Sequence, residues 1–423
     1  MTSSAVRTED AGAPGGAGAP GTGVGSYVRD YLDRVRGGDV GALPAVLGLL
    51  VLVVVFTAMR PVFLTAGNFA NLLTQGAAVT VIAMGLVFVL LLGEIDLSAG
   101  FTSGVCAAVM AVLLADFGQP WWVAVLGALA TGAVIGTVLG SLVARIGIPS
   151  FVVTLAGFLA FQGVVLIIIG SGGNVSIQDT VINAIANKTV PPWAGWLMWV
   201  VGLAGYAAVV LGTAARRRAR GLVAPPMPVV LSRLAALAVV TGFGVYVLNL
   251  ERSRNPLVVS LRGMPVVVPI ILVLLVLLTF VLNRTAYGRH VYAVGGNAEA
   301  ARRAGIPVAR IRTSVFVIGS SMAAVGGIIA ASRATSVDPN AGGSNTLLYA
   351  VGAAVIGGTS LFGGRGRVRD AILGGAVIAV IDNGMGLLGY SAGVKFIVTG
   401  LVLLVAAGVD ALSRKRAAAT GRV

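Results

Sequence analysis

The acidic residues of one short segment are the first candidates for chemistry. Residues 93–100 read Gly-Glu-Ile-Asp-Leu-Ser-Ala-Gly and stand between two long apolar runs. A carboxylate pair such as Glu94 and Asp96 is suited to acid–base catalysis, but no nucleophile or metal cluster accompanies it. Carboxylates beside hydrocarbon must cap a helix, pair with a cation or face water. We therefore expect Asp96 to be the N-cap of the next helix, and Glu94, Asp96 and Ser98 are also candidates for a functional path.

Other reactive side chains are scarce. The chain has one cysteine, Cys106, and one histidine, His290, so neither an internal disulfide nor the usual zinc ligand set is expected. None of the three lysines lies in a G-x-x-x-x-G-K-[ST] sequence, which would cradle the phosphates of a nucleotide. The sequence therefore predicts no catalytic residue, no metal site and no cofactor on this chain, and no ATP hydrolysis through such a loop.

A polar loop at residues 283–312 contains six arginines and one short predicted helix. Asn297 is a good N-cap for this helix, Glu299 in the first turn and Arg302 in the last suit the helix dipole, and Gly305 is placed as a C-cap glycine. A capped helix outside the membrane is a handle for another protein. A solvated amphipathic connector is the alternative interpretation.

Two further features lie near the C-terminus. Residues 353–369 read AAVIGGTSLFGGRGRVR, with two glycine pairs followed by an arginine cluster. Asp382 and Asn383 lie within an apolar run, where an ionisable residue indicates a functional site by default. A hydrogen-bonded Asp–Asn pair with a purely structural role is the alternative. Polar residues within the predicted spans are candidates to line a pathway, although such side chains also hold helices together: Asn71, Gln75, Gln162, Asn249 and Asn383.

The elements that must position these residues follow from composition. Of the 423 residues, 57% are hydrophobic and 11% are charged, whereas soluble domains carry roughly 25% charged residues. The chain is therefore expected to be an all-α polytopic membrane protein. Its net charge of +15 fits the excess of basic residues in cytoplasmic loops better than nucleic-acid binding. Residues 1–42 are rich in Gly, Ala, Pro and Ser, which predicts a disordered cytoplasmic tail and no signal peptide.

Twelve apolar runs have about the length needed to cross a bilayer, with 10–12 spans if some are broken or re-entrant: 43–59, 72–92, 97–115, 121–143, 150–170, 193–213, 232–250, 264–283, 312–331, 346–362, 371–388 and 394–412. They define a transmembrane domain over 43–412, followed by a basic cytoplasmic tail at 413–423. Glycines at 132, 136 and 140 share one helix face and predict close helix packing.

Charge placement gives the orientation. With twelve spans and both termini cytoplasmic, most basic residues lie inside, as the positive-inside rule expects. Three arginines of one loop are the weak point of this topology, because they fall outside. The basic residues placed outside are seven of the 30: Arg60, Lys188, Arg252, Arg254, Arg262, Arg333 and Lys395.

Five segments together resemble the permease subunit of ribose/xylose-type ABC importers. They read GEIDLSAG, PSFVVTLAGFLAFQGV, GRHVYAVGGNAEAARRAGIPVARIR, VDPNAGGSNTLLYAVGAAVIGGTSLFGGRGRV and DNGMGLLGYSAGVKFIVTGLVLLVA, in this order between about 60 and 412. The sequence GEIDLS and an extra helix pair at about 190–260 resemble the xylose type more than the ten-span ribose type. Two departures leave the sugar open: this pair, and Asp382 where an uncharged residue is common.

The resemblance implies a transport subunit of the bacterial inner membrane, not an enzyme. It implies a homodimer in the lipid bilayer, served by ABC ATPase subunits that hold ATP and Mg and by an extracytoplasmic sugar-binding protein. The cargo would be a neutral monosaccharide, with no nucleic acid involved. The residues that would dock on the ATPase are Gly295, Gly296, Asn297, Glu299, Ala300, Ala301, Arg302, Gly305 and Ile306.

Three other functions stay open at this point. An ABC permease for a branched-chain amino acid or another small metabolite is the nearest, and it would need charged groups in the path to balance its substrate. A secondary transporter would couple to ions through carboxylates near the membrane midplane, and Asp382 is the one clear carboxylate deep in a predicted span. A membrane-embedded enzyme would need a convergent catalytic set that the sequence lacks.

Overall fold

The computed structural model describes residues 43–170, 173–222, 224–253, 255 and 260–419. The predicted tail at 1–42 lies outside the described residues. Helices dominate the described part, and the only sheet there is a two-stranded one. The elements are α2 (Leu43–Met59), η1 (Pro61–Leu64), α3 (Ala66–Leu91), α4 (Ala99–Ala115), α5 (Trp121–Ser141), η2 (Leu142–Ile146), α6 (Ser150–Ile169), β1 (Val175–Ser176), α7 (Thr180–Asn187), α8 (Pro192–Ala219), α9 (Met227–Asn249), α10 (Val267–Arg284), α11 (Ala286–Gly296), α12 (Ala298–Arg303), α13 (Val308–Ala334), β2 (Ser336–Val337), α14 (Ser344–Ile356), α15 (Val368–Leu387) and α16 (Ala392–Ala419).

Each of the twelve apolar runs coincides with a helix. Nine helices of the described chain are long and apolar enough to cross a membrane, and α2, α4 and α14 are shorter apolar helices. This confirms a polytopic all-α membrane protein. The predicted run 346–362 extends too far, because α14 ends at Ile356 and a loop follows from 357 to 367. The short helices α7 and α11 and the strands were not predicted, because none of them is a long apolar run.

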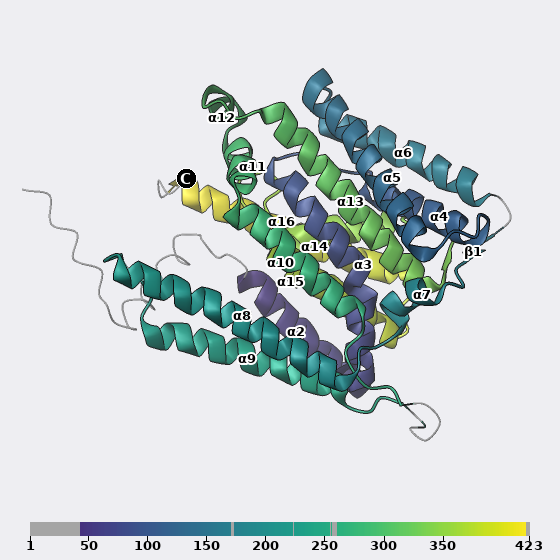
Figure 1. Cartoon of the computed structure of the whole chain (residues 1–423), viewed down its shortest axis with the longest axis horizontal. Helices are drawn as coiled ribbons and strands as arrows, with labels where there is room; N and C mark the ends of the chain where they lie inside the picture. Colours follow the sequence, from purple (N-terminus) through teal and green to yellow (C-terminus); the bar gives the residue numbers. More distant parts are fainter. Residues whose placement is uncertain (1–42, 171–172, 223, 254, 256–259, 420–423) are drawn as a thin grey trace, which may run out of the picture.

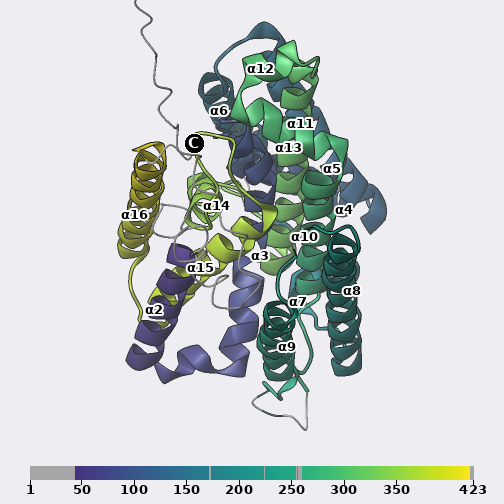
Figure 2. The same ribbon diagram turned by 90° about the vertical axis from the view of Figure 1, so that its left-hand side faces the viewer.

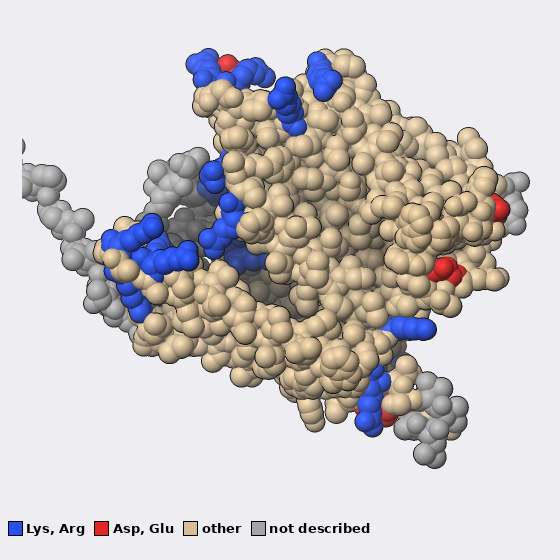
Figure 3. Space-filling model, viewed as in Figure 1, with Lys and Arg blue, Asp and Glu red and all other residues tan. Residues whose placement is uncertain are grey.

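The helices pack side by side in one bundle, with α3 and α13 at its centre (Figures 1 and 2). We call the end that carries α12 the α12 end and the opposite end, which carries α7, the α7 end. On the face shown in Figure 3, charged side chains gather toward the two ends and leave a broad uncharged band between them. A band of this kind is what a bilayer core requires.

Small residues allow the central helices to approach closely. A Cβ atom on Gly132 would lie 2.7 Å from the Ser320 carbonyl oxygen of α13, and one on Gly136 would lie 2.5 Å from the Phe316 carbonyl oxygen. Gly140 faces Thr313 of the same helix in the same way. The glycine repeat therefore packs α5 against α13, which confirms the prediction of a tight contact.

The extra pair α8 and α9 stands at the edge of the bundle (Figure 1). Only 6% of the apolar 18-residue stretch of α8 and 11% of that of α9 are buried inside the protein. The segments that lead into and out of the pair are joined at the α7 end, where the Val190 amide donates to the Met264 carbonyl at 2.8 Å and the Val266 amide donates to the Lys188 carbonyl at 3.0 Å. The α8–α9 pair therefore leaves the bundle and returns to it at the same place, at the α7 end.

Two arginines of the loop after α9, which the predicted topology places outside, make local contacts. Arg252 donates to the Leu248 carbonyl at the end of α9 and to the Gly263 carbonyl, each at 2.9 Å. Arg262 pairs with Glu251 at 2.9 Å. These two guanidiniums therefore close the loop locally, a structural role that overrides the weak positional preference of single charges. Arg254 lies outside the described residues.

Candidate functional sites

The short helix α12 forms as predicted. The Asn297 side-chain oxygen accepts a hydrogen bond from the Ala300 amide at 2.9 Å, and Glu299 pairs with Arg302 at 3.1 Å and with Arg303 at 3.3 Å. Gly305 follows with a φ of +83°, the left-handed conformation that glycine adopts at low cost. Of the predicted docking residues, Ala301 is buried, Gly295 and Ile306 are half-buried, and the remainder are exposed: Gly296, Asn297, Glu299, Ala300, Arg302 and Gly305.

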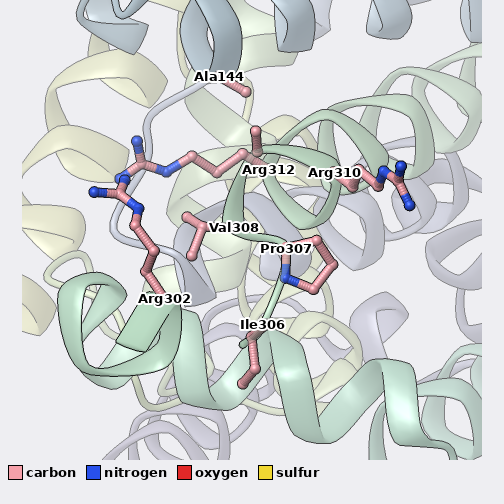
Figure 4. A pocket seen from close by; sticks show the side chains of 8 residues that line it. Ala144, Arg302, Ile306, Pro307, Val308, Arg310 and Arg312 are labelled. Atoms are coloured by element: carbon pink, nitrogen blue, oxygen red, sulfur yellow. The ribbon is translucent and has the colours of Figure 1, made fainter. Parts of the chain in front are cut away.

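A pocket of about 340 Å³ lies between α12 and the start of α13. Figure 4 shows the guanidinium groups of Arg302 and Arg312 side by side, with Ile306, Pro307 and Val308 beneath them. Arg302 is paired with Glu299 and Arg312 with Glu94, each through one nitrogen atom. Because a guanidinium has five N–H donors, both side chains keep donors with which to bind a further carboxylate. This pocket is therefore suited to an acidic side chain of a partner.

Glu94 lies at the α12 end and pairs with Arg312 at 3.2 Å, with both side chains largely shielded from solvent. Asp96 is almost fully buried, and burial raises the pKa of its carboxyl group. The prediction of Asp96 as an N-cap was wrong, because the N-cap of α4 is Ser98. Asp96 instead accepts from the Ser98 amide at 2.9 Å and from the Ser98 hydroxyl at 2.6 Å, and so holds the α3–α4 turn.

A second polar cluster lies toward the α7 end and joins α3, α15 and α16. Asp382 accepts a hydrogen bond from the Gln75 side chain and pairs with Lys395 at 3.3 Å. Asn383 and Asn68 exchange two side-chain hydrogen bonds of 2.9 and 3.0 Å, and Asn383 also donates to Gln75 at 3.2 Å. The structural alternative was a hydrogen bond between Asp382 and Asn383. Instead, each of the two residues bonds to α3 and holds α15 against it.

A pocket of about 370 Å³ opens beside this cluster. Gln75 belongs to both, so one amide faces the pocket and the half-buried carboxylate of Asp382. Side chains of α3 and α13 line the pocket: Thr74, Gln75, Ala78, Ile329, Ala330, Arg333 and Ala334. Such a site offers hydrogen-bond donors and acceptors with one cation, a composition suited to a small polar molecule.

The remaining path candidates make no hydrogen bond to this cluster. Asn71 is exposed on α3, and Gln162 is half-buried on α6. Asn249 is the last residue of α9, and its side-chain oxygen lies close to Gly195 of α8. The side-chain nitrogen and oxygen of Asn249 are buried without a hydrogen-bond partner. Glu94, Asp96 and Ser98 lie at the α12 end. Three of the nine candidates therefore belong to the polar cluster, three lie at the α12 end, and the other three are hydrogen-bonded to neither group.

The comparisons with known proteins decide the family. Residues 68–407 match the family described as "Branched-chain amino acid transport system / permease component". The chain belongs to this family of permease components. The match runs from the start of α3 into α16, so it includes both polar sites. No solved structure matches the chain.

The permease is similar to several curated sugar permeases. It is 37% identical to the xylose transport system permease protein XylH of Escherichia coli (strain K12), over 84% of this chain and 87% of that protein. It is 30% identical to the ribose import permease protein RbsC of the same organism, over 86% and 92%. The D-allose transport system permease protein AlsC is 27% identical, over 87% and 90%.

Sequence reasoning missed four residues of the two sites in this permease. Asn68 had a usable signal, because it lies seven residues before Gln75 and hence on the same face of α3. Arg312, Arg333 and Lys395 were counted only as loop charges. Their partners lie on other helices, so no spacing in the sequence indicates these contacts.

Proposed function

We propose that this permease is the membrane subunit of an ATP-binding-cassette importer for a neutral monosaccharide, xylose- or ribose-like. The carrying observation is the similarity to XylH over nearly the whole of both chains. The amide-rich cluster of Gln75, Asn68 and Asn383 supports it, because hydroxyl groups need donors and acceptors rather than a charge clamp. Gln75 and the neighbouring pocket are the proposed outer part of the path.

The proposed assembly is a homodimer with two cytoplasmic ATPase subunits and an external sugar-binding protein. The helices cross the bacterial inner membrane in 10–12 spans, with the short helices α4 and α14 as the candidates for broken or re-entrant segments. Both termini and the α12 end lie in the cytoplasm. ATP and Mg belong to the ATPase, which contacts α12 and places an acidic side chain between Arg302 and Arg312. Closure of the ATPase dimer moves α12, and a rigid-body shift of helices then changes which side of the path is open.

Transport by the reconstituted complex tests this function. The permease is combined in proteoliposomes with the proposed ATPase and binding-protein partners, and ATP-dependent uptake of labelled xylose, ribose and leucine is measured. We expect uptake of a pentose and no hydrolysis or accumulation by the permease alone. Pentose uptake driven by a proton gradient without partners would overturn the proposal.

Uptake of a branched-chain amino acid is the second candidate function. The family description favours it, and Arg333 and Asp382 could balance the two charges of such a substrate. However, Asp382 is already paired with Lys395. Leucine uptake without pentose uptake in the same experiment would establish this alternative.

A further inference from the structure

Three backbone segments meet at the α12 end without side chains between them. They are the end of α3, the end of α11 and the loop 357–367. A Cβ atom on Gly295 would overlap the carbonyl oxygen of Leu91, and one on Gly363 would lie 2.9 Å from the Gly93 amide nitrogen and 3.1 Å from the Gly295 carbonyl oxygen. We call Gly93, Gly295, Gly363 and Gly364 the glycine contact.

Hydrogen bonds join the same three segments. The Gly364 amide donates to the Leu91 carbonyl at 2.8 Å, so the loop is bonded to the last turn of α3. The Tyr292 hydroxyl of α11 donates to the Gly366 carbonyl at 2.8 Å. The helix that leads into α12 is therefore bonded to the loop, and the loop is bonded to α3.

The loop continues into α15 with equally close packing. Asp370 in the first turn of α15 accepts from the Arg367 amide at 2.7 Å, which caps the helix. Cβ atoms on Gly357 and Gly374 would overlap the carbonyl oxygens of Asp370 and Ala353, respectively. α15 then runs to Asp382 and Asn383 beside the outer pocket.

Backbone in direct contact with backbone has no flexible side chain that could absorb a displacement, and close-packed interiors transmit strain. We propose that the glycine contact transmits the movement of α12 to loop 357–367 and, through α15, to the Gln75–Asp382 cluster. Gly295, which resemblance assigns to docking on the ATPase, is thereby a positioning residue that acts behind the docking surface. This inference rests on the proposed function.

Two helix glycines provide a matched pair of variants. Gly295→Ala introduces a methyl group against Leu91, whereas Gly205→Ala on α8 introduces it where no heavy atom lies within 4 Å. Tyr292→Phe removes only one hydrogen bond, so it tests the same contact even if Gly295→Ala does not fold. Each full-length permease is assembled with its ATPase and binding protein, and three quantities are measured: co-purification of the ATPase, ATP-dependent uptake, and hydrolysis stimulated by the loaded binding protein.

For Gly295→Ala we expect co-purification near that of the wild type and uptake lower by about tenfold, a typical allosteric coupling effect. Gly205→Ala retains uptake. Tyr292→Phe lowers uptake several-fold with the ATPase still bound. Parallel loss of binding and uptake in Gly295→Ala would make Gly295 a docking residue and overturn the proposal. So would wild-type uptake in an inserted Gly295→Ala, or in Tyr292→Phe if the alanine variant does not fold.

A distance measurement separates this inference from the proposed function. A spin label at Arg303→Cys reports the position of the end of α12, and one at Tyr390→Cys reports the position of the turn after α15. The native Cys106 is buried and therefore poorly accessible to the label. We expect ATP to change their separation in the wild-type complex and in Gly205→Ala but not in Gly295→Ala. This result stands even if no tested sugar is transported, whereas an equal change in all three complexes would refute transmission through the glycine contact.

Discussion

The Glu94 carboxylate and the Arg312 guanidinium lie 3.2 Å apart and tie the α3–α4 turn to the start of α13. Arg312 also lines the pocket beside α12. The same guanidinium therefore lines the proposed docking site and contacts the turn that follows the C-terminal end of the central helix α3. This relationship gives the docking site a direct contact with the bundle, besides the glycine contact.

Removal of one member of this pair is expected to destabilise the permease. Glu94→Gln leaves the Arg312 charge without its partner in a largely shielded place, which we expect to cost about 1–2 kcal/mol, less than for a fully buried pair. Thermal unfolding in detergent measures the loss. In a double-mutant cycle with Arg312→Gln, the two effects must be non-additive. Additive effects would show that the pair is not energetically coupled.

Charge reversal in the α12 pocket is expected to impair assembly with the ATPase. Arg302→Glu places an anion where an acidic partner side chain is proposed, and we expect affinity to fall by about tenfold or more. Arg303→Glu is the matched control, because Arg303 is exposed, pairs with the same Glu299 and does not line the pocket. Titration of the ATPase against detergent-solubilised permease measures both affinities. Equal losses would point to net charge rather than to the pocket.

The amide cluster is expected to control the outer path. Asn383→Ala leaves Asn68 and Gln75 without one partner, which costs about 1–3 kcal/mol for a buried polar group and disturbs Gln75 at the pocket. We expect uptake to fall by about tenfold. Asn71→Ala, on the exposed part of α3, should leave uptake unchanged. If both variants transport equally well, the cluster serves packing alone.

The loop after α9 is expected to keep its folded conformation at mildly acidic pH. Hydrogen bonds from the Ser260 hydroxyl and from the Ser253 and Leu261 amides lower the pKa of Glu251 to about 2. A lowered pKa means that the stabilisation is present above the unfolded pKa, begins to fall as the pH drops below about 4.5 and is lost below about 2. Limited proteolysis of this loop across that range measures the effect. Glu251→Gln should be cleaved at every pH, and a wild-type loop already cleaved at pH 6 would contradict the assignment.

The α8–α9 pair is expected to be dispensable for folding. Replacing residues 191–263 by a short glycine linker joins two segments that are already hydrogen-bonded. The uncovered surface of α3 would face lipid rather than water, so little hydrophobic stabilisation is lost. We expect membrane insertion and a melting temperature within a few degrees of the full chain, which corresponds to about 1 kcal/mol. Failure to insert would show that the pair is part of the bundle.

The sequence determined most of what depends on local chemistry. The low charge and the twelve apolar runs required a membrane bundle, because hydrocarbon accepts backbone only as helix or closed barrel. Asn297, Glu299 and Gly305 determined α12, since caps and dipoles act within one turn. The spacing of Gly132, Gly136 and Gly140 determined which face of α5 packs closely, because helical periodicity alone sets it.

Tertiary structure decided what depends on residues far apart in the chain. Asp382 is bonded to Gln75 and Lys395, Glu94 forms an ion pair with Arg312, and no spacing rule brings such pairs together. The N-cap of α4 is Ser98 and not Asp96, a difference of local turn geometry, because Asp96 accepts from the Ser98 amide and hydroxyl. Gly295 was identifiable as a motif residue, but its contact with Leu91 exists only because α3, α11 and loop 357–367 converge. Local patterns specify which elements form, and only packing decides which of their polar groups meet.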